Sequence, residues 1–125
     1  MAVRVMLIED NDVFRNALEV LLALDEGIEI VGSDSDGNEV VDRCRELGPD
    51  VVIVDYRLPG LDGVQVTRLV REHFPRIAVV ALTAAAGERE LGALLDAGAV
   101  ACMAKDQPLD EIVAAVRGAA LEATG

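Results

Sequence analysis

The sequence predicts an α/β fold in which a parallel sheet of five strands carries helices on both faces. Along the 125 residues, short apolar runs alternate five times with longer amphipathic stretches, and such alternation is typical of parallel sheets whose strands are joined by helices. Because crossovers between parallel strands are right-handed, helices are expected on both sides of the sheet. The length corresponds to a single domain that can bury a core of its own.

The predicted strands are five short apolar runs, at residues 3–8, 28–31, 51–54, 77–82 and 99–103. The helices, predicted from apolar residues at helical spacing, lie at about 12–24, 37–46, 63–73 and 87–97, with a last helix beginning at Pro108. The run at 51–54 consists of β-branched residues, which fits a central strand covered on both faces. Residues 1–120 are expected to form the domain, and residues 121–125 a tail or the start of a linker.

The composition excludes several classes of protein. Apolar residues make up 52% of the sequence and aromatic residues only 2%, so the core must be aliphatic. The net charge of −12 disfavours nucleic-acid binding by this domain, since phosphate contacts need clustered Lys and Arg. No apolar run approaches the ~20 residues of a membrane helix, no signal peptide is recognisable, and the two cysteines match neither a disulfide framework nor a zinc site. We expect a cytoplasmic domain that does not bind membranes.

The residues suited to chemistry lie directly after the predicted strands. Glu9 and Asp10 follow the first strand, Asp55 the third and Thr83 the fourth, and Lys105 comes shortly after the fifth. In open α/β sheets, ligands bind outside the carboxyl ends of the strands. The sequence therefore predicts that three carboxylates, a hydroxyl and an ammonium group converge on one edge of the sheet.

This set of groups favours phosphoryl chemistry assisted by a cation. Neighbouring carboxylates repel one another, and a hard cation such as Mg²⁺ or Mn²⁺ relieves the repulsion. A carboxylate can also act as a nucleophile and form an aspartyl phosphate. Phosphoryl transfer depends on neutralising the charge of the phosphoryl oxygens, which the cation, Lys105 and Thr83 would do from three sides.

Four motifs at the ends of these strands carry a family resemblance. They are Ile8-Glu9-Asp10, Val54-Asp55-Tyr56-Arg57-Leu58-Pro59-Gly60-Leu61-Asp62-Gly63, Leu82-Thr83-Ala84 and Ala104-Lys105. With these motifs, the chain resembles the receiver domains of two-component response regulators over about residues 4–117. The resemblance implies the flavodoxin-like receiver fold, with strand order 2-1-3-4-5.

The resemblance also implies a phosphorylation site and a metal site. Asp55 would accept a phosphoryl group from a sensor histidine kinase in a Mg²⁺-dependent reaction. The metal ligands would be Asp55, Asp10, the backbone carbonyl of Arg57 and, mainly through water, Glu9.

Further residues would respond to phosphorylation. Thr83 and Lys105 would contact the phosphoryl group, and Lys105 would pair with Asp55 beforehand. Arg57 and Ala85 occupy the positions that tune the lifetime of the phosphoryl group in this family. Such a domain is a switch, and it is no enzyme apart from catalysing its own aspartyl phosphorylation and dephosphorylation.

Two residues near the lysine depart from the usual pattern of the family. Cys102 stands at the switch position, where Tyr or Phe is usual, and Asp106 stands where Pro commonly follows the lysine. Lys105-Asp106 and residues 107–112 resemble the subgroup joined to a helix-turn-helix DNA-binding output domain. The resemblance implies a phosphorylation-linked homodimer and a role in transcription regulation, with DNA bound only through an output domain that this chain does not contain.

The first predicted helix leaves two interpretations open. Val20, Leu22 and Leu24 extend its apolar residues over more than one face. They form either a wide contact with the core or a dimer surface shared with the last helix.

Three other functions fit parts of the sequence. A pseudo-receiver would keep the fold as an interaction module without phosphorylation, and Cys102 and Glu9 are the features that favour it. A hydrolase with an aspartyl nucleophile would need a second acid two residues later, where this sequence has Arg57, which cannot donate a proton usefully. A flavin-binding domain would need a Ser/Thr-rich phosphate loop and stacking aromatic residues, which the loops lack.

Overall fold

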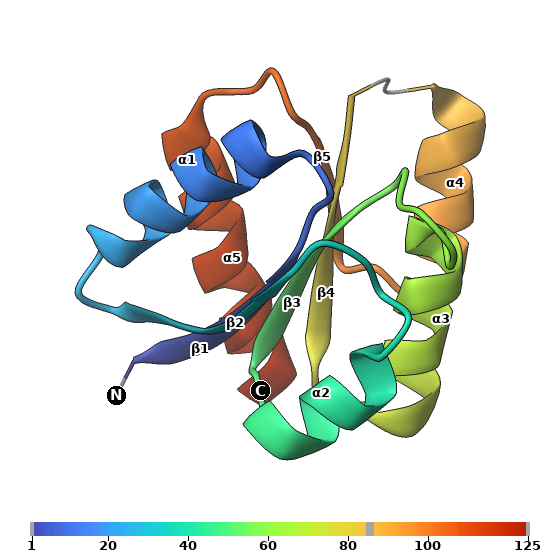
Figure 1. The fold of residues 1–125 in the computed structure, drawn as a ribbon, viewed down its shortest axis with the longest axis horizontal. Helices are drawn as coiled ribbons and strands as arrows, with labels where there is room; N and C mark the ends of the chain where they lie inside the picture. The colour runs from blue at the N-terminus through green and yellow to red at the C-terminus, as the bar shows by residue number, and fades with distance from the viewer. Residues whose placement is uncertain (1, 85–86, 125) are drawn as a thin grey trace.

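The structure is a computed structural model that describes residues 2–84 and 87–124. Five strands form a parallel sheet in the order β2-β1-β3-β4-β5, and helices cover both faces (Figure 1). Along the chain the elements are β1 (Val3–Ile8), α1 (Asp12–Ala23), β2 (Ile28–Asp34), α2 (Val40–Leu47), β3 (Val51–Asp55), α3 (Gly63–His73), β4 (Ala78–Thr83), α4 (Glu88–Asp96), β5 (Ala101–Ala104) and α5 (Leu109–Thr124). The predicted fold class and strand order are confirmed.

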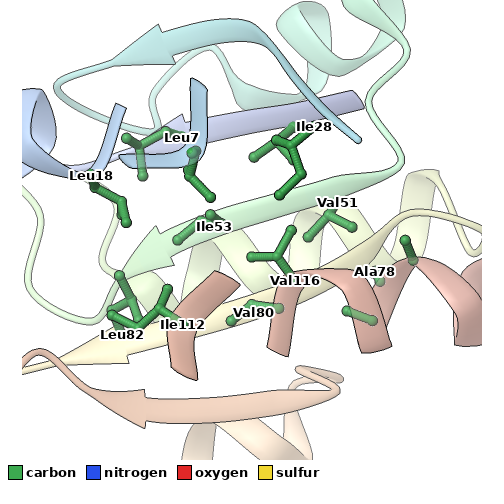
Figure 2. Packing of buried hydrophobic residues seen from close by; sticks show 14 residues of the cluster. Leu7, Leu18, Ile28, Val51, Ile53, Ala78, Val80, Leu82, Ile112 and Val116 are labelled. Atoms are coloured by element: carbon green, nitrogen blue, oxygen red, sulfur yellow. The ribbon is translucent and has the colours of Figure 1, made fainter. Parts of the chain in front are cut away.

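Different helices cover the two faces of the sheet. On one face, Leu18 of α1 and Ile112 of α5 pack with Ile53 of β3 in a single buried cluster (Figure 2). On the other face, Val66 of α3 and Leu94 of α4 belong to a second buried cluster, to which α2 also contributes. The sheet is therefore packed separately on its two faces.

Alternation along the strands divides the core between these two clusters. In β1, Val5 and Leu7 belong to the cluster under α1 and α5, whereas Met6 and Ile8 belong to the other cluster, because successive strand side chains point to opposite faces. All five residues of β3 are buried. β3 is therefore covered on both faces, as its run of β-branched residues predicts.

β2 ends at Asp34 rather than at residue 31, where its apolar run ends. Its last residues are polar, so hydrophobic periodicity does not reveal them as part of a strand. They pair with β1 up to the partners Ile8 and Asp34, and the Glu9 N–H then donates to the Asp34 carbonyl at 3.0 Å. The longer β2 thus supports the chain at the point where it leaves β1.

Two helices also differ from their predicted bounds. α2 begins at Val40, because Asp36 accepts a hydrogen bond from the Asn38 N–H at 3.0 Å and forms a turn before the helix. α5 runs to Thr124, so residues 121–124 continue the helix. None of the helices in the part of the chain that the structure describes is long and apolar enough to cross a membrane.

Candidate functional site

The carboxyl ends of the strands bring the predicted site residues to one edge of the sheet. Glu9 directly follows β1, Asp55 is the last residue of β3 and Thr83 is the last residue of β4. Asp55 is paired with Leu82 in the sheet, the residue next to Thr83. The Lys105 N–H donates to the Thr83 carbonyl at 2.9 Å, which fixes the lysine just beyond the end of β5.

Three carboxylates form an acidic cluster at this edge. Glu9, Asp10 and Asp55 each offer an oxygen, and these oxygens all lie within 4.8 Å of one another. Glu9 and Asp55 are buried, with 1% and 5% of their surface exposed, whereas Asp10 is exposed. A cation would therefore approach the cluster from the side of Asp10.

Lys105 bridges the two buried carboxylates. Its Nζ lies 3.0 Å from Asp55 Oδ2 and forms an ion pair with Glu9 Oε1. The lysine side chain is only 18% exposed, so this pairing takes place largely away from water. The ammonium group pairs with two of the three carboxylates, and the cluster keeps a net negative charge when all four groups are ionised.

Burial and charge raise the pKa values of Glu9 and Lys105. Burial raises the pKa of Glu9 from 4.5 to about 7, and Asp55 adds to the rise, although Lys105 and the Asn11 N–H oppose it. For Lys105, burial alone would lower the pKa, but pairing with Glu9 and Asp55 outweighs burial and raises it. The lysine is therefore charged at neutral pH, while Glu9 is partly protonated near pH 7.

The residues present fit a hard divalent cation such as Mg²⁺. All the candidate ligands are oxygens, the type that Mg²⁺ prefers. Glu9 Oε1 is buried and has the Lys105 ammonium as its ion-pair partner. One ammonium group does not neutralise three carboxylates, and buried charge is costly unless it is compensated. The acidic cluster thus has the donor set and the charge that such an ion needs.

The start of α1 fixes the backbone around Glu9. The Asn11 N–H donates to Glu9 Oε2 at 3.0 Å, and Asn11 Oδ1 caps the helix by accepting from the Phe14 N–H at 2.9 Å. Arg15 Nη1 donates to the Glu9 carbonyl at 2.8 Å. Both the side chain and the main chain of Glu9 are therefore held by residues of α1 and its cap.

A close approach between α3 and β3 positions Asp55. α3 begins at Gly63, whose N–H donates to the Tyr56 carbonyl at 2.8 Å. A Cβ on Gly63 would lie 2.4 Å from the Asp55 carbonyl oxygen, which is too short for any side chain. Asp62 and Gln65 form a capping box at the same helix end. Glycine is therefore needed here so that α3 can approach the strand that carries Asp55.

Other predicted residues are less closely tied to the acidic cluster. Cys102 lies on β5, packs half-buried against the core cluster under α2, α3 and α4, and burial raises the pKa of its thiol. Arg57 follows β3 with an exposed side chain, and the role of its carbonyl as a metal ligand stays a prediction. Thr83 is buried, and its role stays a prediction too. Ala85 lies outside the described residues.

Phe14 is a neighbour of the site that the sequence did not single out. Its ring lies under the Lys105 ammonium, with Nζ 4.8 Å from the ring centroid. Helical spacing indicates only that Phe14 faces the core, and nothing in the local sequence connects it with a lysine near the other end of the chain. The contact becomes visible only when α1 and the turn after β5 are placed together.

The chain matches known proteins over almost its whole length. Residues 5–117 match the family described as the response regulator receiver domain. Response regulator GacA of Pseudomonas viridiflava is 37% identical over 115 residues, which cover 92% of this chain and 54% of that protein. This chain therefore spans about half the length of the curated relatives it matches.

Two solved structures share the fold. The signal receiver domain of NarL from Mycobacterium tuberculosis has a TM-score of 0.89 and 32% identity, covering 96% of this chain and 97% of that one. A LuxR-family two-component response regulator from Aurantimonas sp. SI85-9A1 has a TM-score of 0.92 and 26% identity, covering 98% and 87%. Together with the acidic cluster and its bridging lysine, these matches show that the chain belongs to the response regulator receiver domain family.

Proposed function

We propose that this receiver domain is switched by transfer of a phosphoryl group from a histidine kinase to Asp55, in a Mg²⁺-dependent reaction. The observation that carries the proposal is the pairing of Asp55 Oδ2 with Lys105 Nζ at 3.0 Å beside the acidic cluster. An aspartate next to a fixed ammonium and to further carboxylate ligands can accept a phosphoryl group with its charge compensated.

In the proposed reaction, an Asp55 carboxylate oxygen forms a bond to phosphorus while the phosphorus–nitrogen bond of a phosphohistidine breaks. The electron pair of the broken bond stays on the imidazole nitrogen of the kinase. Lys105 lies beside the reacting carboxylate and stays charged, because pairing with Glu9 and Asp55 raises its pKa despite burial. It can therefore turn from the carboxylate toward the new phosphoryl oxygens, to which Thr83 would add a hydroxyl donor.

The carboxylates of the acidic cluster would hold the Mg²⁺, with the Arg57 carbonyl as a further ligand. A bound divalent cation supplies charge neutralisation to the carboxylate and phosphoryl oxygens. Burial raises the pKa of Glu9 to about 7, so occupation of the site would be accompanied by loss of the remaining Glu9 proton.

Phosphorylation would shift an equilibrium between two surfaces of the domain, through the charge and the acceptor oxygens it adds. A homodimer is part of the proposal. Its surface would include exposed apolar side chains: Val20 of α1 (64% exposed), Leu24 at the end of α1 (76%) and Leu121 of α5 (74%). Transcription regulation through a DNA-binding output domain is also proposed, in keeping with the greater length of the relatives and the LuxR-family match. A cytoplasmic location belongs to the same proposal.

Incubation of the purified chain with acetyl phosphate and Mg²⁺ tests the proposal. We expect the intact mass to rise by one phosphoryl group, and we expect Asp55→Asn or removal of Mg²⁺ by a chelator to abolish the rise. Asp96→Asn, at the exposed end of α4, is the matched control and should be modified like the wild type. An unmodified wild-type protein, or uptake by Asp55→Asn, would contradict the proposal and favour a phosphorylation-independent interaction module.

A further inference from the structure

We infer that Phe14 is a positioning residue that holds the Lys105 ammonium at the phosphorylation site through the face of its ring. The inference rests on the proposed function of Asp55 and Lys105, and it gives α1 a direct contact with the lysine in addition to its contacts with Glu9. Lys105 Nζ lies 4.8 Å from the centroid of the Phe14 ring. This is within the roughly 6 Å over which cation–π attraction operates.

The surroundings of Lys105 favour a contribution from the ring. The ammonium group has three N–H donors and no acceptor, and its anionic partners are Asp55 Oδ2 and Glu9 Oε1. The Phe14 ring is a third neighbour. With its side chain only 18% exposed, Lys105 has lost most of its water, and partial removal from water strengthens cation–π attraction.

The position of the ring is tied to the same acid that binds the lysine. The Phe14 N–H donates to Asn11 Oδ1 at 2.9 Å, and the Asn11 N–H donates to Glu9 Oε2 at 3.0 Å. The other oxygen of Glu9 pairs with Lys105. Glu9 is thus connected to Phe14 by two routes, through the helix cap and through the ammonium group, and the ring keeps its place relative to the lysine.

Phosphorylation requires Lys105 to change its anionic partner. Its ion pairs with the carboxylates depend on short, specific contacts, which weaken when the ammonium turns toward a phosphoryl oxygen. The Phe14 ring takes no part in this exchange of anions, and Nζ begins 4.8 Å from its centroid, inside the roughly 6 Å range of cation–π attraction. We expect Phe14 to keep Lys105 at the carboxyl edge during this exchange, so that the charge is in place when the phosphoryl group arrives.

A purely structural role for Phe14 is the competing explanation, because the ring also packs against the core cluster under α1 and α5. The two explanations differ in what they predict for Lys105. A positioning role requires the ring and the lysine to act together, whereas a structural role does not depend on the lysine.

Lys105 is the only lysine of the 125 residues, which allows a direct test of the contact. In protein labelled with ¹³C at lysine Cε, one methylene signal reports on Lys105. We expect the Phe14 ring current to displace this signal from its random-coil position, Phe14→Leu to remove the displacement and Phe14→Tyr to keep it. Phe74→Leu is the matched control, because the other phenylalanine has Arg45 as its cation neighbour. An undisplaced wild-type signal would overturn the inference.

The phosphorylation rate tests what the contact does. With acetyl phosphate and Mg²⁺, we expect Phe14→Leu to lower the rate constant about three- to tenfold and Phe14→Tyr to stay within about twofold of the wild type. Phe74→Leu should leave the rate unchanged. Urea unfolding shows whether each variant is folded under the conditions in which its rate is compared with that of the wild type. A wild-type rate in folded Phe14→Leu would overturn the inference.

The variant Lys105→Gln distinguishes a positioning role of Phe14 from a purely structural role. If Phe14 acts through Lys105, adding Phe14→Leu to Lys105→Gln has no further effect on the rate. An equal effect of Phe14→Leu with and without the lysine would overturn the inference. A wild-type chain that takes up no phosphoryl group would instead overturn the proposed function, and the lysine signal would still decide whether Phe14 holds Lys105.

Discussion

The two sides of the acidic cluster differ in how many contacts hold their residues in place. On the α1 side, Asn11, Phe14 and Arg15 all contact Glu9 or Lys105. On the opposite side, β5 is a strand of only four residues, all of them partly exposed. Its side chains are small apart from one methionine, and Cys102 occupies the position where the family usually has an aromatic ring.

Under the proposed function, this difference would separate the residues that receive a phosphoryl group from the residues that transmit the change. Lys105, which follows β5 and lies over the Phe14 ring of α1, is already against Asp55 before any reaction. This arrangement would lower the cost of organising charge during the proposed transfer. The β5 side offers Cys102 in place of a ring, and its packing is looser. We infer that the α1 side is organised in advance and that conformational change is easier at β5, whose four residues are all partly exposed.

The largest expected effect comes from Lys105, the residue shared by both sides. Lys105→Gln should lower the rate of phosphorylation by acetyl phosphate about 100-fold, because it removes the fixed positive charge beside Asp55. Time courses of intact mass measure the rate. Arg117→Gln is the matched control. Arg117 is an exposed cation on α5, and it pairs with Asp25 in the loop after α1. A loss below about fivefold would show that the lysine does not stabilise the transferred charge.

Gly63, at the start of α3, tests whether the backbone at Asp55 is as constrained as the side chains around Glu9. Gly63→Ala should lower the free energy of unfolding by ~2 kcal/mol, because the new Cβ would lie 2.4 Å from the Asp55 carbonyl oxygen. Urea denaturation measures the change. Gly118→Ala in α5 meets nothing within 4 Å and should raise the free energy of unfolding by ~0.5–1 kcal/mol. Equal stability of Gly63→Ala and the wild type would refute this close approach.

The pH dependence of Mg²⁺ binding tests the electrostatics of the cluster. Burial raises the pKa of Glu9 to about 7, so below that pH a proton competes with the metal. The dissociation constant for Mg²⁺ should therefore rise up to about tenfold for each unit of pH below 7, and level off above about pH 8. Calorimetric titrations measure it. Glu9→Gln should remove this dependence, whereas Asp10→Asn should weaken binding and retain it. A constant wild-type affinity between about pH 6 and pH 8 would contradict the raised pKa of Glu9.

The part of the site that depends on topology could be predicted from the sequence. Parallel strands end at a common edge, and Glu9, Asp55 and Lys105 each follow an apolar run. The sequence therefore predicts that these three residues lie close together. The order of the strands came from the family resemblance, since periodicity alone does not fix which strands are neighbours.

The contacts that depend on tertiary packing could not be predicted. Phe14 lies at a core position of α1, and its proximity to Lys105 follows from how that helix sits against the turn after β5. Arg15 donates to a backbone carbonyl of Glu9, which no sequence pattern marks. Apolar periodicity does not predict the extension of β2 to Asp34, because the last residues of the strand are polar and pairing with β1 holds them in place.

The smallest expected effect concerns Cys102 on β5, and it tests the comparison between the α1 side and the β5 side of the acidic cluster. Cys102→Ala should change the rate of phosphorylation by less than about twofold, because the side chain packs against the core cluster under α2, α3 and α4 and belongs to none of the contacts around Lys105. The free energy of unfolding should fall by ~1 kcal/mol, since a half-buried sulfur is lost. Intact-mass kinetics and urea denaturation measure the two quantities. A rate change as large as that of Phe14→Leu would mean that β5 organises the lysine as much as α1 does, and the division into a receiving and a reading side would fail.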